Sequence, residues 1–239
     1  MGDRSKIEWT NSTWNPTRGC NCLIPEVLSA PLRWKKPRRI FVDSMSDLFH
    51  EQVPDEFIEQ VFAIMARAPQ HTFQILTKRP ERMSQWVERF YDNWCWPESG
   101  CPIGLGPLPH IWLGVSCEDQ PTADERIPWL LQTPAAVRFI SYEPALGPVD
   151  LGFYLFPWHC CRSDDQQQYH GLTSHCERCW QSRATINWAI AGGESGLGVR
   201  PAHPDWFRSV RDQCVAAQVP FYFKQWGEWT WQLQRVVFD

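Results

Sequence analysis

The chain has 239 residues, which is enough for one large hydrophobic core, either as a single α/β domain or as one domain with a small insert. Its formal net charge of −4 argues against a generally basic protein that wraps nucleic acid, and leaves room for a local basic patch. No apolar run reaches ~18 residues and the first residues lack a secretory core, so we expect a cytoplasmic protein without membrane contact.

A pattern of buried strand, polar turn and amphipathic helix recurs along the chain. It is clearest at Ile40–Val42, an apolar run bounded by charge, which precedes polar residues and a helix predicted over Asp55–Ala68. Further helices are predicted over Glu81–Phe90, from Thr122 with a break or restart at Pro128, and over Pro204–Ala217. Strands are predicted at Ile7–Thr10, Ile40–Val42, His71–Thr77, Ile111–Val115, Val137–Ile140, Trp188–Ala191 and Val219–Phe223.

This alternation predicts an α/β fold, an incomplete (β/α) barrel of mostly parallel strands, with a doubly wound sheet as the main alternative. We expect residues 1–150 and 186–239 to form a single partial barrel domain. Residues 151–185 are polar and rich in Cys and His, and we interpret them as a zinc-binding insert. Residues 23–38, rich in Pro and basic side chains, are expected to be loop.

Charged and polar residues follow the predicted strands. The carboxyl ends of parallel strands meet at one edge, so these residues should line a single mouth. Unpaired charge beside a core is costly, which favours a ligand or catalytic site over a ring of salt bridges, although the ring stays an alternative. The catalytic candidates are Lys78, Glu118, Glu143 and Lys224; the cofactor-binding candidates are Ser116, Gly192, Gly193, Glu194 and Ser195; the substrate-binding candidates are Asp43, Ser46, Asp47 and Arg79.

The stretch Gly192–Gly196 is the sharpest of these signals. Glycines after a strand let the backbone approach a ligand closely and expose amide donors, and Glu194 offers a carboxylate to an amine or hydroxyl. The spacing is not that of a dinucleotide-binding motif, and no phosphate-binding loop follows. A tight strand-to-loop turn is the alternative.

Cysteines supply a second signal. In the insert, Cys160 and Cys161 stand opposite Cys176 and Cys179, which suits structural zinc, with free thiols or another metal as alternatives. Near the start of the chain, Cys20 and Cys22 alone are too few to hold an iron–sulfur cluster.

The chain also has one basic cluster, at Lys35–Arg39. It is either a contact for phosphate or nucleic acid or an ordinary solvated surface.

Several motifs occur in the same order in one known family. The motifs are Ile7-Glu8-Trp9-Thr10, Thr13-Trp14-Asn15-Pro16, Pro31-Leu32-Arg33-Trp34, the stretch from Phe41 to His50, Leu76-Thr77-Lys78-Arg79-Pro80, the stretch from Gly192 to Gly196, and Phe223-Lys224-Gln225-Trp226-Gly227. On these motifs the chain resembles the phage and prophage proteins called the gp-thirty-seven/gp-sixty-eight family, of uncharacterised function, which is similar to the radical S-adenosylmethionine barrels.

The resemblance implies a [4Fe-4S] cluster and S-adenosylmethionine as cofactors. Members of the family usually carry three cysteines after the first strand. Cys20 matches the first of these and Cys22 the third, and the middle cysteine is missing. The two cysteines would then be the remnant of a cluster motif.

Three functions follow from these features. The first is a radical S-adenosylmethionine-type enzyme that acts on nucleic acid or another phage-related substrate. In it Glu143, Glu194 and Ser116 would bind the amino-acid end of the cofactor, and Lys78 and Lys224 its carboxylate or a substrate phosphate. The second is a non-catalytic module that binds nucleic acid or a phage or host protein. The third is a cluster-independent hydrolase or lyase that uses the carboxylates of Asp43, Glu118, Glu143 and Glu194.

Overall fold

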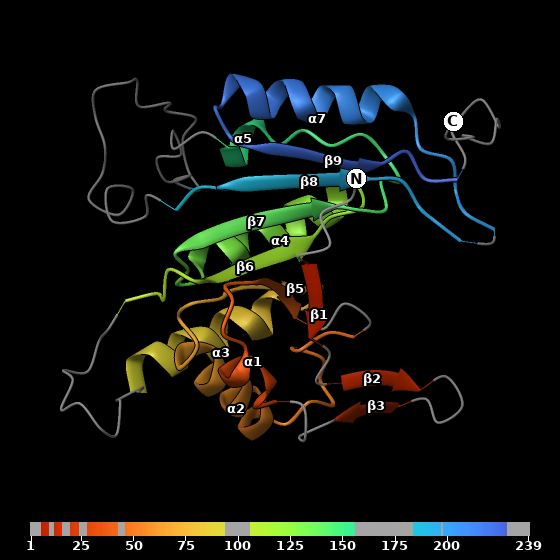
Figure 1. Cartoon of the computed structure of the whole chain (residues 1–239). Helices are drawn as coiled ribbons and strands as arrows, with labels where there is room; N and C mark the ends of the chain where they lie inside the picture. Colours follow the sequence, from red (N-terminus) through yellow and green to blue (C-terminus); the bar gives the residue numbers. More distant parts are fainter. Residues whose placement is uncertain are drawn as a thin grey trace, which may run out of the picture. The chain divides into compact units, whose positions relative to one another are not determined.

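A computed structural model of the chain divides into two compact units. Unit 1 comprises Met1–Ser116 and Thr133–Arg138, and unit 2 comprises Cys117–Gln132 and Phe139–Asp239 (Figure 1). The residues that the structure describes are 6–9, 12–15, 20–23, 28–42, 46–93, 106–155, 184–196 and 198–228.

Unit 1 contains four parallel strands, in the order β1-β4-β5-β6. Two further strands, β2 and β3, form a separate antiparallel pair. The strands are β1 (Lys6–Trp9), β2 (Ser12–Asn15), β3 (Cys20–Leu23), β4 (Arg39–Val42), β5 (Thr72–Thr77) and β6 (Ile111–Ser116), and the helices are α1 (Ala30–Arg33), α2 (Asp55–Ala66) and α3 (Pro80–Asn93).

The core of unit 1 is aromatic where α2 meets α3. Phe62 on α2 packs against Trp86 and Phe90 on α3, with ring centroids 4.7 Å and 5.1 Å away, and Phe49 packs against Phe62 and Trp86 from the loop before α2. All four side chains are buried. Trp86 and Phe90 are four residues apart on α3, which places both rings on the side that meets Phe62 of α2, so the burial of these rings fixes how the two helices pack.

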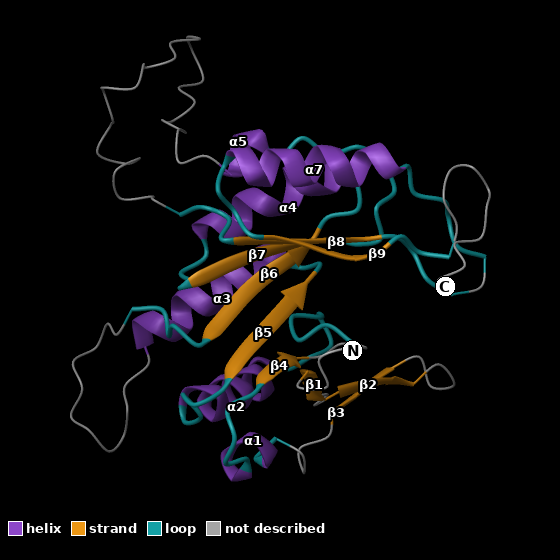
Figure 2. Ribbon diagram, turned by 45° about the horizontal axis from the view of Figure 1, so that its top comes forward, coloured by secondary structure: helices purple, strands orange, loops and turns teal. Residues whose placement is uncertain are grey.

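Unit 2 contains three parallel strands, in the order β7-β8-β9. Helices α5 and α7 lie side by side (Figures 1 and 2). The Gln213 side chain of α7 accepts a hydrogen bond at 2.5 Å from the backbone N of Leu151, the residue before α5. The elements are β7 (Val137–Tyr142, whose first two residues belong to unit 1), β8 (Trp188–Gly192), β9 (Phe221–Gln225), α4 (Gln120–Gln132), α5 (Gly152–Leu155) and α7 (Pro204–Ala216).

Parallel strands alternate with helices in both units, which confirms the predicted α/β class of an open, incomplete (β/α) barrel. All seven predicted strands are present, with β9 starting two residues later than predicted. None of the described helices is long and apolar enough to cross a membrane.

Four local predictions need correction. Pro128 neither breaks nor restarts α4, which runs through it without interruption. Helix α1 lies within the predicted loop 23–38, and α5 lies within the predicted insert, where no element was expected. The β2–β3 pair was not predicted, because each strand has only four residues and neither carries an apolar alternation.

Replacement of Phe62 by Ala should strongly destabilise the protein. Phe62 is fully buried among Phe49, Trp86 and Phe90, so its truncation leaves a cavity and should lower the free energy of unfolding by about 3–5 kcal/mol. Urea unfolding followed by tryptophan fluorescence measures the loss. The matched control is Glu59→Ala, an exposed position on the same helix, which should stay within about 0.5 kcal/mol of wild type. Equal losses in the two variants would contradict the aromatic core.

Candidate functional site

Three strands of unit 2 bring their carboxyl ends together through direct side-chain contacts. Lys224 Nζ, on β9, donates to Glu143 Oε1, just after β7, at 2.8 Å. Gln225 Nε2 donates to the same oxygen at 3.5 Å and to the carbonyl of Gly193, just after β8, at 3.2 Å. We call Glu143, Gly192, Gly193, Lys224 and Gln225 the strand-end cluster.

Gly192 allows the carboxylate of Glu143 to lie against the backbone of β8. A Cβ atom on Gly192 would stand 3.2 Å from both Cδ and Oε1 of Glu143, closer than side chains normally approach. The missing side chain of Gly192 therefore makes room for the acid of the strand-end cluster.

Gly193 has a different role, which is to let two turns meet backbone to backbone. A Cβ atom on Gly193 would stand 2.0 Å from the carbonyl oxygen of Trp226. The facing residue, Gly227, has φ +83, and a Cβ there would stand 2.6 Å from the carbonyl oxygen of Glu194. Hydrogen bonds from Gly193 N to Gln225 O at 2.9 Å and from Glu228 N to Glu194 O at 3.2 Å join the turns. Packing alone thus explains Gly193, in line with the alternative of a tight turn.

Glu194 is held by Arg200. Arg200 donates from Nε to Oε2 at 2.9 Å, from Nη2 to Oε1 at 2.6 Å, and from its backbone N to Oε2 at 2.8 Å. These side-chain and backbone hydrogen bonds from Arg200 lower the pKa of Glu194 to about 2. The predicted cofactor ligand is therefore ionised and already carries a bidentate partner, while its neighbour Ser195 is exposed.

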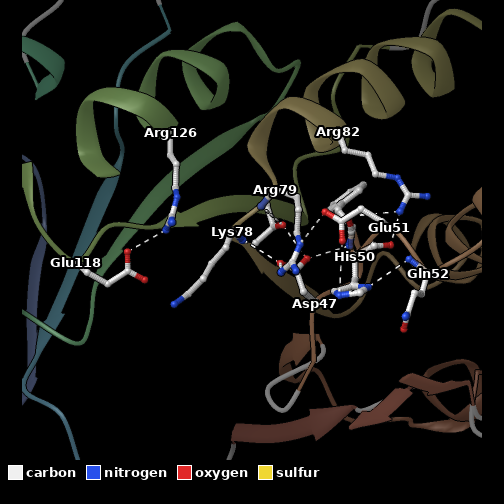
Figure 3. A network of polar contacts seen from close by, with 11 residues as sticks. Asp47, His50, Glu51, Gln52, Lys78, Arg79, Arg82, Glu118 and Arg126 are labelled. Atoms are coloured by element: carbon white, nitrogen blue, oxygen red, sulfur yellow. Dashed lines mark hydrogen bonds and ion pairs between the residues drawn. The ribbon is translucent and has the colours of Figure 1, made fainter. Parts of the chain in front are cut away.

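Glu118, at the start of unit 2, is buried with a cation of its own. Arg126 Nη1, on α4, donates to Glu118 Oε2 at 2.9 Å, and both side chains are largely shielded from solvent (Figure 3). Backbone hydrogen bonds reinforce the position, since Glu118 N donates to Thr122 Oγ1 and Leu146 N donates to Glu118 O. Arg126 supplies the counter-charge that this buried carboxylate needs, and a carboxylate neutralised in this way is a poor candidate for a general acid or base.

In unit 1, Asp47 joins the loop after β4 to the end of β5. Its Oδ1 accepts from Phe49 N at 3.0 Å and Thr77 Oγ1 at 2.7 Å, and its Oδ2 accepts from Lys78 N at 2.9 Å and Arg79 Nη1 at 3.0 Å (Figure 3). Four donors fill the acceptor positions of this carboxylate. Asp47 and Arg79, both predicted to bind substrate, thus hold two loops together, while the side chain of Lys78 extends away from the Asp47 carboxylate.

Arg82 is a central residue of unit 1 that the sequence did not reveal. From α3 it donates to the carbonyls of Phe49, His50 and Val53, and to Asp55 Oδ1 at 2.7 Å. One guanidinium thus satisfies several backbone acceptors of the loop before α2. The only sequence signal is a cation on the first turn of a helix, which is too common to be informative.

The remaining predicted residues fall into three groups. Ser116, at the end of β6, is buried, and Ser46 is half-buried, both in unit 1. Cys20 and Cys22 lie on β3, opposite Asn15 and Thr13 of β2. Asp43, Cys160, Cys161, Cys176 and Cys179 lie outside the described residues, so the zinc site remains a prediction.

Among the residues that the structure describes, no group of three or more His, Cys, Asp and Glu side chains is arranged to hold a metal ion. Two parts of the predicted site are each brought together within one unit: the strand-end cluster in unit 2, and Asp47 with Arg79 in unit 1. The single mouth predicted for residues of both units stays a prediction.

Replacement of Gly193 by Ala should disrupt the two joined turns. The new methyl group would overlap the Trp226 carbonyl, so the backbone must move and the free energy of unfolding should fall by about 1–3 kcal/mol or more. Chemical denaturation measures the change. Gly147→Ala is the matched control, because a Cβ at that position would make an ordinary contact at 3.5 Å with Asp119. A Gly193→Ala protein as stable as this control would refute the close backbone contact.

Glu194 should titrate far below its ordinary pKa of 4.5, near pH 2, because Arg200 stabilises the ionised form. A lowered native pKa stabilises the fold above the unfolded value, and this contribution disappears as the pH falls from about 4.5 towards 2. Carbon-13 NMR of the Glu194 carboxyl, assigned with Glu194→Gln, measures the midpoint. Arg200→Gln should return it towards 4.5, whereas Arg211→Gln, on α7, should leave it unchanged. A wild-type midpoint near 4.5 would contradict the pairing.

Comparison with known proteins assigns the chain to a family without assigning a function. The sequence model of DUF5131, described as a protein of unknown function, matches residues 21–237, and the chain belongs to this family. Neither the curated proteins nor the solved structures contain a match.

Proposed function

We propose that this member of the DUF5131 family is a phage-related protein with a radical S-adenosylmethionine-like barrel scaffold that acts on nucleic acid. In this proposal the strand-end cluster binds the amino-acid end of S-adenosylmethionine. The observation that carries the proposal is the pair of opposite charges, Lys224 and Glu143, 2.8 Å apart at the carboxyl ends of parallel strands and beside Gly192. Ligands of open α/β sheets bind at this end of the strands.

The chemistry of the pair matches an α-amino acid group. Such a group carries an ammonium and a carboxylate on one carbon atom, so Glu143 would take the ammonium and Lys224 the carboxylate. Lys224 is exposed and Glu143 half-buried, so a ligand can reach both. Gln225 offers a further donor beside Glu143. When the ligand binds, Glu143 exchanges the ammonium of Lys224 for that of the ligand, and Lys224 exchanges the carboxylate of Glu143 for that of the ligand. Neither charge is left unpaired, which avoids the free-energy cost of an unpaired charge.

The cysteines present do not fit a radical S-adenosylmethionine cluster. A [4Fe-4S] cluster with one iron left for S-adenosylmethionine takes three protein thiolates, and the motif supplies Cys20 and Cys22 alone. This missing thiolate favours a second candidate function, a non-catalytic module on the same scaffold that binds nucleic acid or a phage or host protein.

Isothermal titration calorimetry with S-adenosylmethionine tests the proposed site. Glu143→Gln and Lys224→Met should each weaken binding about tenfold or more, because each removes a charge-assisted hydrogen bond to the amino-acid end. Arg208→Met is the matched control: it removes an exposed ion pair with Asp205 on α7 and should leave binding unchanged. Methylthioadenosine, which lacks the amino-acid end, should bind with equal affinity to the wild-type protein, the two strand-end variants and the Arg208→Met control.

Absence of binding to the wild-type protein, or wild-type affinity in both Glu143→Gln and Lys224→Met, would overturn the proposed site. Iron analysis after anaerobic reconstitution then separates the two functions. About four irons per chain would support the enzyme, with a thiolate recruited from elsewhere. Little or no bound iron, with S-adenosylmethionine binding intact, would support the non-catalytic module.

A further inference from the structure

A short basic segment leads from α1 into β4. Five of its seven residues are cations, and no acidic residue occurs between positions 27 and 42, although the whole chain has a net charge of −4. The side chains of Arg33, Lys35 and Lys36 are exposed. We call Arg33–Arg39 the basic segment. Its positive charge is concentrated at one place on a chain that is otherwise acidic, and it lies at the amino end of β4.

An aromatic ring lies within this positive charge. The guanidinium carbon of Arg38 stands 4.7 Å from the ring centroid of Trp34, a cation–π contact. The indole is half-buried, and its ring meets the ring of His71 edge-on at 5.9 Å. Arg38 and Trp34 together form a flat group of the kind on which an unpaired base stacks.

The backbone of the basic segment is fastened to β5. His71 is buried, and its Nε2 lies 2.9 Å from the carbonyl oxygen of Pro31, two residues before the segment. Thr72 N donates to the carbonyl of Arg38 at 2.8 Å, near the other end. Held at both ends, the segment presents its cations in a fixed arrangement, which lowers the entropy lost when a ligand binds.

We infer that the basic segment binds single-stranded nucleic acid, with Lys35 and Lys36 on phosphates and a base stacked on Arg38 and Trp34. Phosphate neutralisation and base stacking are the two main sources of affinity for single strands. A membrane surface fits less well, because interfacial anchoring needs an apolar face, and the large apolar side chains exposed in the described part of the chain, Phe153, Val215 and Tyr222, lie outside the segment.

This inference deepens the proposed function, since it rests on nucleic acid as the substrate, but it does not require S-adenosylmethionine. Fluorescence anisotropy with a labelled single-stranded oligonucleotide of about 20 nucleotides, at several salt concentrations, tests the inference. Lys35→Gln/Lys36→Gln should weaken binding and reduce the magnitude of the slope of log affinity against log salt by about 1.4. This value is the loss of two phosphate contacts, at about 0.7 for each contact with a single strand. Arg208→Gln/Arg211→Gln removes the same charge from exposed positions on α7 and should leave the slope unchanged.

Trp34→Leu keeps an apolar side chain but removes the stacking surface. It should weaken single-strand binding about tenfold without changing the salt slope, and should affect a duplex of the same length much less. Circular dichroism confirms that each variant is folded. An affinity and a salt slope in Lys35→Gln/Lys36→Gln equal to those of wild type would overturn the inference. So would a wild-type protein that binds vesicles of phosphatidylserine and phosphatidylcholine through Lys35 and Lys36 but does not bind the oligonucleotide.

The same variants separate this inference from the proposed cofactor site. Lys35→Gln/Lys36→Gln should bind S-adenosylmethionine like wild type, and Glu143→Gln should bind the oligonucleotide like wild type. A protein that binds the oligonucleotide through Lys35 and Lys36 but not S-adenosylmethionine would remove the cofactor site and leave the basic segment standing.

Discussion

Charge neutralisation at the ends of buried parallel strands is the constraint on which the arrangement of polar residues depends. A carboxylate that follows such a strand stands beside an apolar core, where an unpaired charge is costly, so it needs a cation nearby. Both units meet this need in the same way, with a cation from another strand end, a helix or a turn. The four pairs are Asp47 with Arg79, Glu118 with Arg126, Glu143 with Lys224, and Glu194 with Arg200.

The pairs differ in what they can do besides neutralise charge. Glu118 and Arg126 have side chains only 9% and 14% exposed, so their pair belongs to the fold. Asp47 has no acceptor position to spare. Glu194 and Arg200 are more exposed, but three hydrogen bonds within one turn hold the carboxylate in place.

The pair of Glu143 and Lys224 is different, because it joins two strand ends through a single hydrogen bond. The Lys224 side chain is 47% exposed, against 19% for Glu143. This pair is thus the one of the four whose cation can most readily leave its partner for a ligand.

Much of the fold could be predicted because apolar runs such as Ile40–Val42 mark buried strands whatever their neighbours are. The short elements β2, β3 and α1 were missed, since four residues are too few for a periodic signal and none of the three has an uninterrupted run of large apolar residues such as that of β4. For the site, the positions of Asp47, Glu118, Glu143 and Glu194 after strands could be read from the sequence, and their role towards a ligand stays a prediction. Their cations were harder to find, because Arg126 and Arg200 become neighbours of the acids only when a helix or a turn has formed. The contact of Gly193 with Trp226 joins residues far apart in sequence, and no local pattern reports it.

The preformed pair also bears on which ligands the strand-end cluster can select. A simple anion that draws Lys224 away leaves the carboxylate of Glu143 without its cation, and a simple cation that binds Glu143 leaves the ammonium of Lys224 without its anion. Binding of either ligand must therefore offset the free-energy cost of the charge that is left without a partner. A zwitterion supplies a new partner to both residues at once. In the proposed function the cluster would therefore discriminate first by the number and sign of the ligand charges, and an α-amino acid group is the simplest structure that would supply both partners.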